Sequence, residues 1–322
     1  MSRRFLKFPR ARGLLCLTAF WVCVVAAPPR AFGRETDGSS SGIRAIDAVD
    51  NSIGAAVDDA RFGYGELNQG AAYSPGEGKY LDSESGYLKG AKVTASYMGD
   101  VGDYIQNFYS QVAYDFVYGY PYYNGYTQGG TPVQGPSQAN IANLAVKMGR
   151  SFEAGKSSMI TPYIIGGYHQ WVRGLSYGTD NGYTETYRDG FAGAGAMLQY
   201  AIGARLVATA QGSFSETLWP TMDTNNDETY YPSVCQANPG LCQVDSFRLG
   251  SRPLEMAGFE LDYHLAGALH FFVGGDYSHF SYGASPWVSD PLMEQLGYEF
   301  MEPHSLTDML FWSAGLRWSF GP

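Results

Sequence analysis

The chain has 322 residues, among them 41 Gly, 25 Tyr and 18 Phe, but only 16% are charged, and its formal net charge is -10. Disordered chains are poor in aromatics and rich in charge, and long coiled coils are rich in Ala, Glu, Lys, Leu and Arg, so the composition excludes both. A mean hydropathy of -0.21 and the lack of a long apolar run beyond the N-terminus exclude a bundle of transmembrane helices.

The first 33 residues have the layout of a secretory signal peptide. Five basic residues between Arg3 and Arg12 precede the apolar stretch 14–27, which is the order of a charged region followed by an apolar one. The stretch is shorter than the ~20 residues of a spanning helix, which disfavours the alternative of a membrane anchor. Small residues predict cleavage before Arg34, with Ala26 or Ala27 as the alternative. We expect 34–59 to be a flexible periplasmic leader, with a short helix near 44–57.

Removal of 1–33 would change both charge and cysteine content. The segment holds six basic residues and no acidic ones, so the remainder carries 15 basic and 31 acidic residues. Such an acidic surface repels nucleic acid, because phosphate binding needs a basic face. Cys16 and Cys23 leave with the signal. The remaining pair, Cys235 and Cys242, lies in a Gly/Pro/Asn-rich segment of an exported chain, which predicts a local disulfide.

The rest of the chain, 60–322, alternates between apolar and small or polar residues, which is typical of β-strands. In the last strand, Leu310, Trp312, Ala314, Leu316, Trp318 and Phe320 share one face. Two large aromatics at the end of an apolar face are typical of a lipid-facing strand, because aromatic girdles mark both membrane interfaces. A secreted soluble β-sandwich also alternates, but strand length and loop asymmetry favour a membrane barrel.

The alternation predicts an all-β fold, a transmembrane antiparallel up-and-down β-barrel of ten strands, with eight or twelve as alternatives. The expected strands are 60–68, 87–98, 104–119, 139–152, 158–176, 183–200, 205–217, 248–265, 268–284 and 305–320. Short turns near 99–103, 153–157, 201–204 and 266–267 alternate with loops 69–86, 120–138, 177–182, 218–247 and 285–304. Short periplasmic turns and longer external loops are the outer-membrane pattern. Several strands exceed the ~9–11 residues that cross a bilayer, so we expect the barrel to project outward.

Aromatic side chains beside the short turns are expected to form the inner girdle: Tyr97, Tyr104, Tyr200, Tyr263, Trp318 and Phe320. These features place the protein in the bacterial outer membrane of a Gram-negative cell envelope. Its expected partners are outer-membrane lipid and lipopolysaccharide, the barrel-assembly machinery and an unidentified surface partner, with no nucleic acid.

The opposite face of the strands should point into the lumen. Its charged side chains are Lys92, Asp115, Lys147, Arg173, Glu185, Asp189, Arg205, Glu260, Asp262, Asp276 and Arg317, with His169, His264 and His270 beside them. Small barrels are filled by side chains, and buried charges must be paired or hydrated. We therefore expect a network that plugs the lumen, with a narrow ion path as the alternative. Arg173 and Glu185 should pair near its outer end.

The long loops are acidic. They carry one base, Lys79, and twelve acids: Glu77, Asp82, Glu84, Asp180, Asp223, Asp227, Glu228, Asp245, Asp290, Glu294, Glu299 and Glu302. This predicts an outer rim of negative potential that attracts cations, or simply a solvated face. Loop aromatics such as Tyr122, Tyr126 and Trp287 could bind a partner surface.

Over 60–320 the chain resembles small outer-membrane β-barrels, and its ten strands resemble the omptin-like group. Omptins are proteases with a pair of carboxylates and an Asp-His dyad at the outer rim. The chain departs from that pattern, because 120–138 contains no Asp or Glu, and Asp262-Tyr263-His264 falls beside an inner turn. His279 with Ser278, and His304 with Ser305, resemble an outer-membrane phospholipase only in being adjacent.

The sequence contains neither a phosphate-binding Gly-rich loop nor a His/Cys cluster with metal-ligand spacing. We therefore expect no catalytic residues, no cofactor and no metal. The expected function is that of a non-enzymatic barrel with a structural or surface-interaction role. A narrow cation-preferring pore is the alternative, and a rim hydrolase of omptin or phospholipase type is the second alternative.

Overall fold

The computed structural model describes residues 40–67, 80–126, 131–175, 183–225, 232–241, 245–289, 291–297 and 299–320. All belong to one compact unit, Thr36–Pro322. The long strands are β1 (Ser52–Leu67), β2 (Tyr80–Val101), β3 (Ile105–Gly119), β6 (Gln138–Arg150), β8 (Ser158–Leu175), β9 (Tyr183–Ile202), β10 (Leu206–Thr224), β12 (Pro253–Ala266), β13 (Leu269–Tyr282) and β14 (Ser305–Ser319). The short elements are α2 (Ser41–Asp50), β4 (Tyr122–Tyr126), β5 (Pro132–Pro136), β7 (Phe152–Glu153), α4 (Pro232–Ala237), β11 (Asp245–Arg248) and α5 (Pro291–Leu296).

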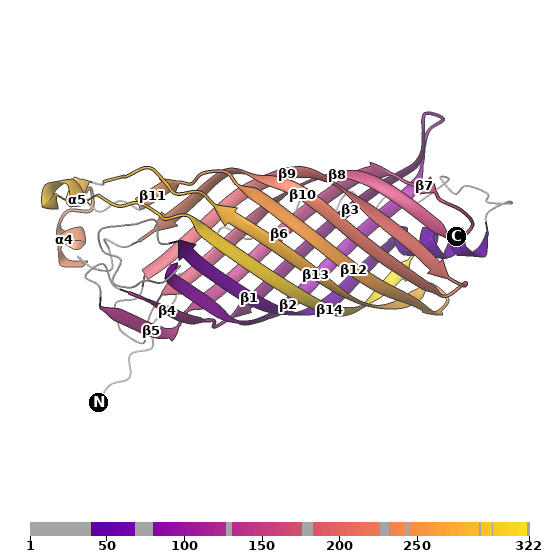
Figure 1. The fold of residues 1–322 in the computed structure, drawn as a ribbon, viewed down its shortest axis with the longest axis horizontal. Coiled ribbons are helices and arrows are strands. Elements are labelled where there is room, and N and C mark those ends of the chain that lie inside the picture. The colour runs from indigo at the N-terminus through magenta and orange to yellow at the C-terminus, as the bar shows by residue number, and fades with distance from the viewer. Residues whose placement is uncertain are drawn as a thin grey trace. The chain divides into compact units, whose positions relative to one another are not determined.

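The ten long strands form a closed antiparallel barrel. Each pairs with the next in chain order, and β1 pairs with both β2 and β14, which joins the two ends of the sheet. Strands of the near and far walls slant in opposite directions in Figure 1, as a tilted barrel requires. The expected fold class and strand number are confirmed. Among the described residues, no helix is long and apolar enough to cross a membrane.

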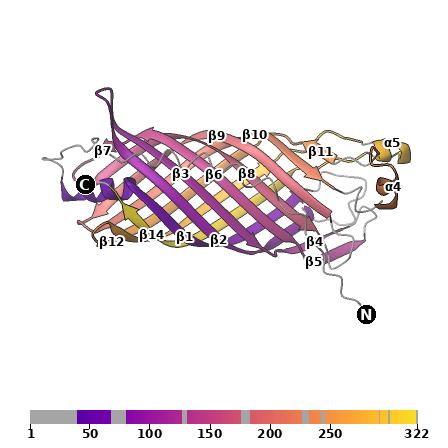
Figure 2. The same cartoon turned by 180° about the vertical axis from the view of Figure 1, so that it is seen from behind.

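The short connections all lie at one end of the barrel. They are 102–104, 151–157, 203–205 and 267–268, and the indigo helix α2 and the C-terminus lie at the same end (Figures 1 and 2). The opposite end carries β4, β5, α4, β11 and α5. Therefore the expected separation into short turns and long loops is confirmed. The end with the short turns, which is expected to face the periplasm, is called the inner end below.

Several expected boundaries need correction. The first strand begins at Ser52, within the expected leader 34–59, because Ile53, Ala55 and Val57 alternate with small residues and pair fully with β14. The acidic Asp58 and Asp59 interrupt that apolar alternation and concealed it. The expected loop 120–138 contains the β4–β5 hairpin. The expected loop 218–247 is shortened because β10 continues to Thr224 and pairs with β11.

The outer surface of the barrel has an apolar belt. On β14, Trp312, Leu316 and Trp318 are exposed, whereas Ser313 and Arg317 are buried inside, as the alternation predicts. Exposed large side chains continue around the belt, including Val57, Ile164, Leu198, Phe214, Phe259, Phe271 and Val273. Soluble proteins rarely expose a contiguous apolar patch of this size to water. The belt is therefore expected to be covered by lipid.

A ring of outward-facing polar residues marks the outer edge of the belt. It comprises Asp59, Arg61, Lys89, Gln170, Arg188, Glu216, Glu255, His279 and Asp308. Neighbouring strands place these residues side by side: Asp59 next to Lys89, and His279 between Glu255 and Asp308. From this ring to Trp318, β14 offers about the 9–11 residues that span a bilayer. The strands continue beyond the ring, so the barrel projects outward as expected.

The expected inner girdle lies at the end with the short turns. Tyr104, Tyr200, Tyr263, Trp318 and Phe320 are exposed there, and Tyr97 is half-buried beside them. The belt therefore ends at aromatic side chains on its inner side, as in outer-membrane barrels. The expected signal peptide, 1–33, lies outside the described residues.

Candidate functional site

The inner end of the lumen is covered by α2. Ser40 caps this helix, because its Oγ accepts a hydrogen bond from the Ile43 amide at 3.3 Å. Ile43, Ile46 and Val49 are buried, and the helix contacts strands on several sides of the barrel, β2, β8, β9, β10 and β14. It thus lies across the opening as a plug.

Close contacts hold α2 in this position. A Cβ on Gly42 would lie 2.8 Å from the Lys156 carbonyl oxygen, so only glycine lets the helix approach the 151–157 connection. At the other end of the helix, Asn51 Oδ1 accepts a hydrogen bond from the Met98 amide at 3.1 Å. The plug is therefore attached to the barrel wall by backbone contacts as well as by apolar packing.

Asp50, the last residue of α2, is buried at the inner end of the lumen. Gln199 Nε2 donates a hydrogen bond to its Oδ1 at 2.8 Å. Burial raises the pKa of Asp50 to about 7, and the hydrogen bond from Gln199 and the charge of Arg317 only partly oppose the shift. The docking of α2 is therefore linked to a proton near neutral pH.

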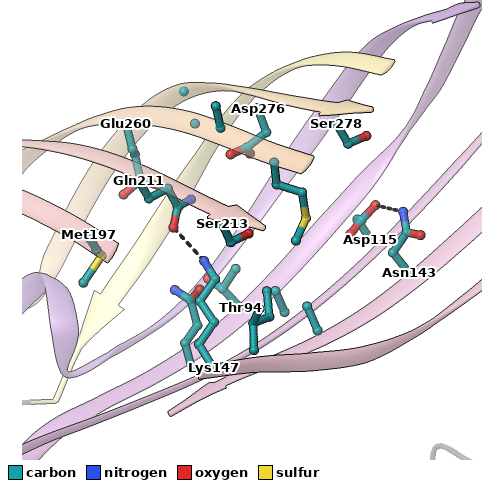
Figure 3. A pocket seen from close by; sticks show the side chains of 18 of the residues that line it. Thr94, Asp115, Asn143, Lys147, Met197, Gln211, Ser213, Glu260, Asp276 and Ser278 are labelled. Carbon is teal, nitrogen blue, oxygen red and sulfur yellow. Dashed lines mark hydrogen bonds between the residues drawn. The ribbon is translucent and has the colours of Figure 1, made fainter. Parts of the chain in front are cut away.

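The middle of the lumen is crossed by paired polar side chains. Lys92 Nζ lies 2.6 Å from Asp276 Oδ2, and Lys147 Nζ donates to Gln211 Oε1 at 2.6 Å. Figure 3 shows Lys147 and Gln211 joined across the pocket, with Asp115 and Asn143 joined beside them. Nearer the inner end of the lumen, Arg317 pairs with Glu260 and Asp262 at 2.8 Å, and Asp262 also pairs with His270 at 2.6 Å.

Two residues of the expected lumen network lie elsewhere. Arg205 is exposed in the turn 203–205, because the strand before it already ends at Ile202. His264 is half-buried at the next inner turn, where its Nε2 lies 2.8 Å from the Gly267 carbonyl oxygen. Both side chains therefore belong to the inner rim and do not fill the lumen.

A cavity of about 210 Å³ remains in the lumen, lined by these pairs, by the end of α2 and by side chains nearer the outer end. Its outer wall is mainly apolar and includes Phe191, Leu254, Phe280, Met309 and Phe311. Its polar part includes His169, whose Nδ1 donates to Asp189 at 3.0 Å. The Nε2 atom of His169 is buried without a hydrogen-bond partner among the described residues.

A layer of stacked aromatic rings covers this cavity on the outer side. Trp171 stacks on Tyr187 with ring centroids 4.9 Å apart, and Tyr187 stacks on Tyr282 at 5.7 Å. Tyr64 and Phe62 meet Trp171 edge-on at 4.9 and 5.5 Å. All five side chains are at most 5% exposed, so the layer fills its part of the lumen.

Directly outside this layer, Arg173 lies among carboxylates. Its Nε donates to Glu84 at 2.5 Å, and its Nη1 to Glu185 at 2.7 Å and Glu66 at 3.1 Å. Asp82 lies 3.3 Å from Nη2. The expected pair of Arg173 with Glu185 is confirmed, and the guanidinium also stacks over the Tyr64 ring at 4.8 Å.

A fifth carboxylate, that of Glu302, joins this group through Tyr187, whose hydroxyl donates to Glu302 at 2.7 Å and lies 3.1 Å from Glu185. We call Arg173 with Glu66, Asp82, Glu84, Glu185 and Glu302 the Arg173 cluster. It lies beyond the polar ring, on the part of the barrel outside the membrane. Burial, followed by repulsion from Glu185, raises the pKa of Glu302 to about 8.

The Arg173 cluster corrects part of the expected acidic rim. Asp82, Glu84 and Glu302 are largely buried and converge on the lumen, whereas Glu294 and Glu299 are exposed. Asp223 pairs with Arg188. The rim acids Glu77, Asp180, Asp227, Glu228 and Asp290, the base Lys79 and the side chain of Asp245 lie outside the described residues.

Sequence reasoning found only Arg173 and Glu185 of this cluster as lumen residues. Glu66 was missed because it falls at the outer end of β1, and Asp82 and Glu84 because β2 was expected to begin at 87. Their spacing of two residues is the signal that could have shown an inward-facing strand. Glu302 lies outside any strand, so no periodic pattern marks it.

The expected hydrolase candidates are not assembled as pairs. Ser278 lines the cavity, whereas His279 faces outward and pairs with Asp308 at 2.9 Å, because neighbouring residues of a strand point to opposite faces. His304 Nε2 and Ser305 Oγ are both buried without a hydrogen-bond partner in the described part of the chain. Asp262 and His264 lie near the inner turn, as expected.

No protein-family model matches the sequence, and neither does any curated protein. Among solved structures, the outer membrane protease OmpT of Escherichia coli aligns with a TM-score of 0.49 and 11% identity, over 84% of this chain and 97% of that protein. The translocator domain of autotransporter NalP from Neisseria meningitidis gives 0.40 and 11%, over 87% and 94%. The Pseudomonas putida toluene transporter TodX gives 0.34 and 8%, over 90% and 95%.

The strand pairing itself carries the classification. It closes ten strands into an antiparallel barrel with an apolar outer belt. The chain therefore has the fold of an outer-membrane β-barrel with ten long strands.

Proposed function

We propose that the protein is a closed outer-membrane barrel with a structural or surface-interaction role and no catalytic activity. The observation that carries this proposal is the closure of the lumen at two levels. The helix α2 covers the inner end, and buried aromatic rings with the Arg173 cluster cover the outer end. A constitutive channel would need a continuous hydrated path, which these two layers interrupt.

The projecting part of the barrel supports a surface role. It exposes Tyr120, Tyr122, Trp219 and Trp287, and exposed aromatic side chains are enriched at protein interfaces. The paired extension of β10 with β11 and the β4–β5 hairpin give this region a defined shape. An unidentified surface partner could bind there. Outer-membrane lipid and lipopolysaccharide would surround the belt, and the barrel-assembly machinery would insert it.

Planar-bilayer recordings test the closed lumen. At neutral pH the purified barrel should give no single-channel current. A variant lacking residues 34–50 has no inner plug, and its baseline current should differ from that of the intact protein. Steady current through the intact protein would contradict the proposal. Loss of cell-surface partner binding after removal of 226–244, with the barrel still heat-modifiable on unheated gels, would support the surface role.

A narrow cation-preferring pore is the second candidate. The cavity lining contains five acids (Asp50, Asp115, Asp189, Glu260 and Asp276) and three bases (Lys92, Lys147 and Arg317). An acidic lining concentrates cations. If the variant without α2 conducts, its reversal potential in a salt gradient should show a preference for K⁺ over Cl⁻.

Export and oxidation complete the proposal. A signal peptide, 1–33, would direct the chain across the inner membrane, and the periplasm would allow Cys235 to pair with Cys242. Cys235 is buried in α4, and Cys242 lies outside the described residues. Mass spectrometry of unreduced tryptic peptides from outer-membrane fractions should find the two joined, and recovery of both as free thiols would contradict the pairing.

A further inference from the structure

The cavity and the Arg173 cluster are parts of one arrangement. The cavity lies between the α2 plug and the aromatic layer, and the Arg173 cluster lies on the outer side of that layer. Passage from outside the cell to the cavity therefore leads past the cluster. Both the cavity lining and the cluster contain more acids than bases.

The Arg173 cluster holds more negative charge than its cation can balance. Its five carboxylates come from β1, β2, β9 and the segment 299–304, and its one guanidinium comes from β8. Among the described residues, Arg173 alone forms ion pairs with these carboxylates. In the same described part of the chain, the phenols of Tyr64 and Tyr187 contact the carboxylates, and the Tyr123 ring faces Arg173. Because a buried uncompensated charge is costly, some of the carboxylates must hold protons in the closed state.

The aromatic layer is hydrogen-bonded directly to these carboxylates. The Tyr64 hydroxyl donates to Glu66 at 2.9 Å. The Tyr187 hydroxyl donates to Glu302 at 2.7 Å and lies 3.1 Å from Glu185. A change in the charge of a carboxylate therefore acts on the same side chains that cover the cavity.

Glu302 is the one carboxylate of the Arg173 cluster that does not come from a barrel strand. It lies outside the strands, where its amide donates to Ser285 Oγ at 2.9 Å and its carbonyl oxygen accepts from the Ser285 amide at 2.9 Å. The remaining carboxylates are on barrel strands. Moving 299–304 away would relieve repulsion within the cluster. It would break the hydrogen bonds of this segment to Leu67, Ser285 and Val288, but not the strand pairing that closes the barrel.

We propose that the Arg173 cluster is a proton-operated seal, closed while its carboxylates share protons and open when they ionise, which admits small cations to the lumenal cavity. Burial raises the pKa of Asp82 to about 6 and that of Glu302 to about 8, and it also raises the pKa of Glu66. A raised pKa means that the closed state is stable below it and loses stability as the pH rises through it. The seal should therefore open on the alkaline side of neutrality.

Accessibility of a cysteine in the cavity tests this proposal. Ser278 lines the cavity, so Ser278→Cys is made in a chain whose Cys235 and Cys242 are changed to serine. Its rate of modification by a cationic methanethiosulfonate, added to the outer side of vesicles, is compared with that of Ser85→Cys, which is exposed on the projecting flank. This ratio corrects for the pH dependence of an exposed thiolate, and the same ratio measured in Glu302→Gln corrects for the different pKa of the buried thiol.

We expect the ratio to rise about tenfold or more between pH 6 and pH 9.5. A change of 1.4 kcal/mol in the free-energy difference between the closed and open seal suffices for that factor. The cationic reagent should react faster than the anionic sulfonatoethyl reagent. Glu302→Gln, which cannot ionise, should abolish the rise near pH 8. Glu299→Gln, an exposed acid of the same segment, is the matched control and should leave the rise unchanged.

A second variant distinguishes a change in the seal from simple misfolding, because it should shift the pH of opening and not abolish opening. Tyr187→Phe removes the hydrogen bond that stabilises ionised Glu302, so the midpoint of opening should move to higher pH. A ratio that stays constant from pH 6 to pH 9.5 in a heat-modifiable barrel, or a rise that persists in Glu302→Gln, would overturn the seal. The two proposals fail separately: current through the intact protein at neutral pH contradicts the closed barrel, whereas a constant ratio in an electrically silent barrel contradicts only the seal.

Discussion

Arg173 is the side chain on which most of the outer closure depends. It is 1% exposed and meets carboxylates from three other strands, while its guanidinium covers the Tyr64 ring. Arginine suits this position because its planar fork offers five donors and keeps its charge when buried. The same residue thus holds together β1, β2, β8 and β9 above the membrane.

Replacement of Arg173 tests this role. In Arg173→Met the carboxylates lose their cation, and the free energy of unfolding should fall by about 3–5 kcal/mol, as when one partner of a buried ion pair is removed. Arg173→Lys is the control and should lose less, because it keeps the charge but not the fork. Urea unfolding of the barrel in lipid vesicles measures both. A loss below about 1 kcal/mol for Arg173→Met would show that the Arg173 cluster does not stabilise the barrel.

Asp50 gives a second prediction, in which pH is the variable. Since its pKa is raised to about 7, the docking of α2 should weaken as the pH rises through that value, when the buried carboxylate ionises. Asp50→Asn keeps an oxygen acceptor for Gln199 and stays neutral. Proteolysis of α2 should therefore be equal in the two proteins at pH 5.5 and slower in the variant at pH 8.5. Equal rates at both pH values would contradict the linkage.

At the scale of elements, α2 and the barrel are held together by different interactions, so α2 can detach while the barrel stays folded. The strands are joined by a continuous hydrogen-bonded ladder, whereas α2 is held by apolar side chains and its two ends. Low-stability elements open locally without unfolding the rest. Loss of α2 packing should hence release the plug and leave the barrel intact.

The substitution Ile46→Ala probes this separation. Ile46 is fully buried, and truncation of such a side chain costs about 2–5 kcal/mol. Hydrogen exchange in 41–50 should become faster by two or more orders of magnitude, while the strands keep their protection. Arg44→Ala, at an exposed position of the same helix, should change neither. Equal loss of protection in the strands would show that plug and barrel unfold together.

The positions of most strands follow from the sequence, because a period of two is a local property. The last strand was expected at 305–320 and runs over Ser305–Ser319, and the expected 158–176 runs over Ser158–Leu175. The first strand was placed too late because Asp58 and Asp59 look like a loop. Asp58 is accommodated inside, where Ser313 donates to it at 2.6 Å, and that partner is 255 residues away.

At the scale of the whole molecule, the cost of a charge on the outward face depends on its depth in the apolar belt. Ala314 lies midway between Trp318 and the polar ring, on the lipid-facing side of β14. Ala314→Arg should therefore lower the free energy of unfolding in vesicles by about 2–4 kcal/mol, as for arginine at the bilayer midplane.

Asn140→Arg is the matched control for this prediction. Asn140 alternates with the buried Ala139 and Ile141 and thus faces outward at the level of the polar ring. Near the interface the cost should fall to about 0–1 kcal/mol. Similar losses at the two positions would contradict the placement of the belt.

The sequence by itself determined the strand alternation, the two faces, the strand number and the division into short turns and long loops. Each of these depends on residues close together in the chain. Only the tertiary structure decided which acids lie on the rim and which are buried. Glu302 and Asp82 have the local context of solvated loop residues, but barrel closure brings both to Arg173, far from them in sequence. The same holds for α2, because a short amphipathic helix shows its role as a plug only once the barrel supplies a lumen to cover.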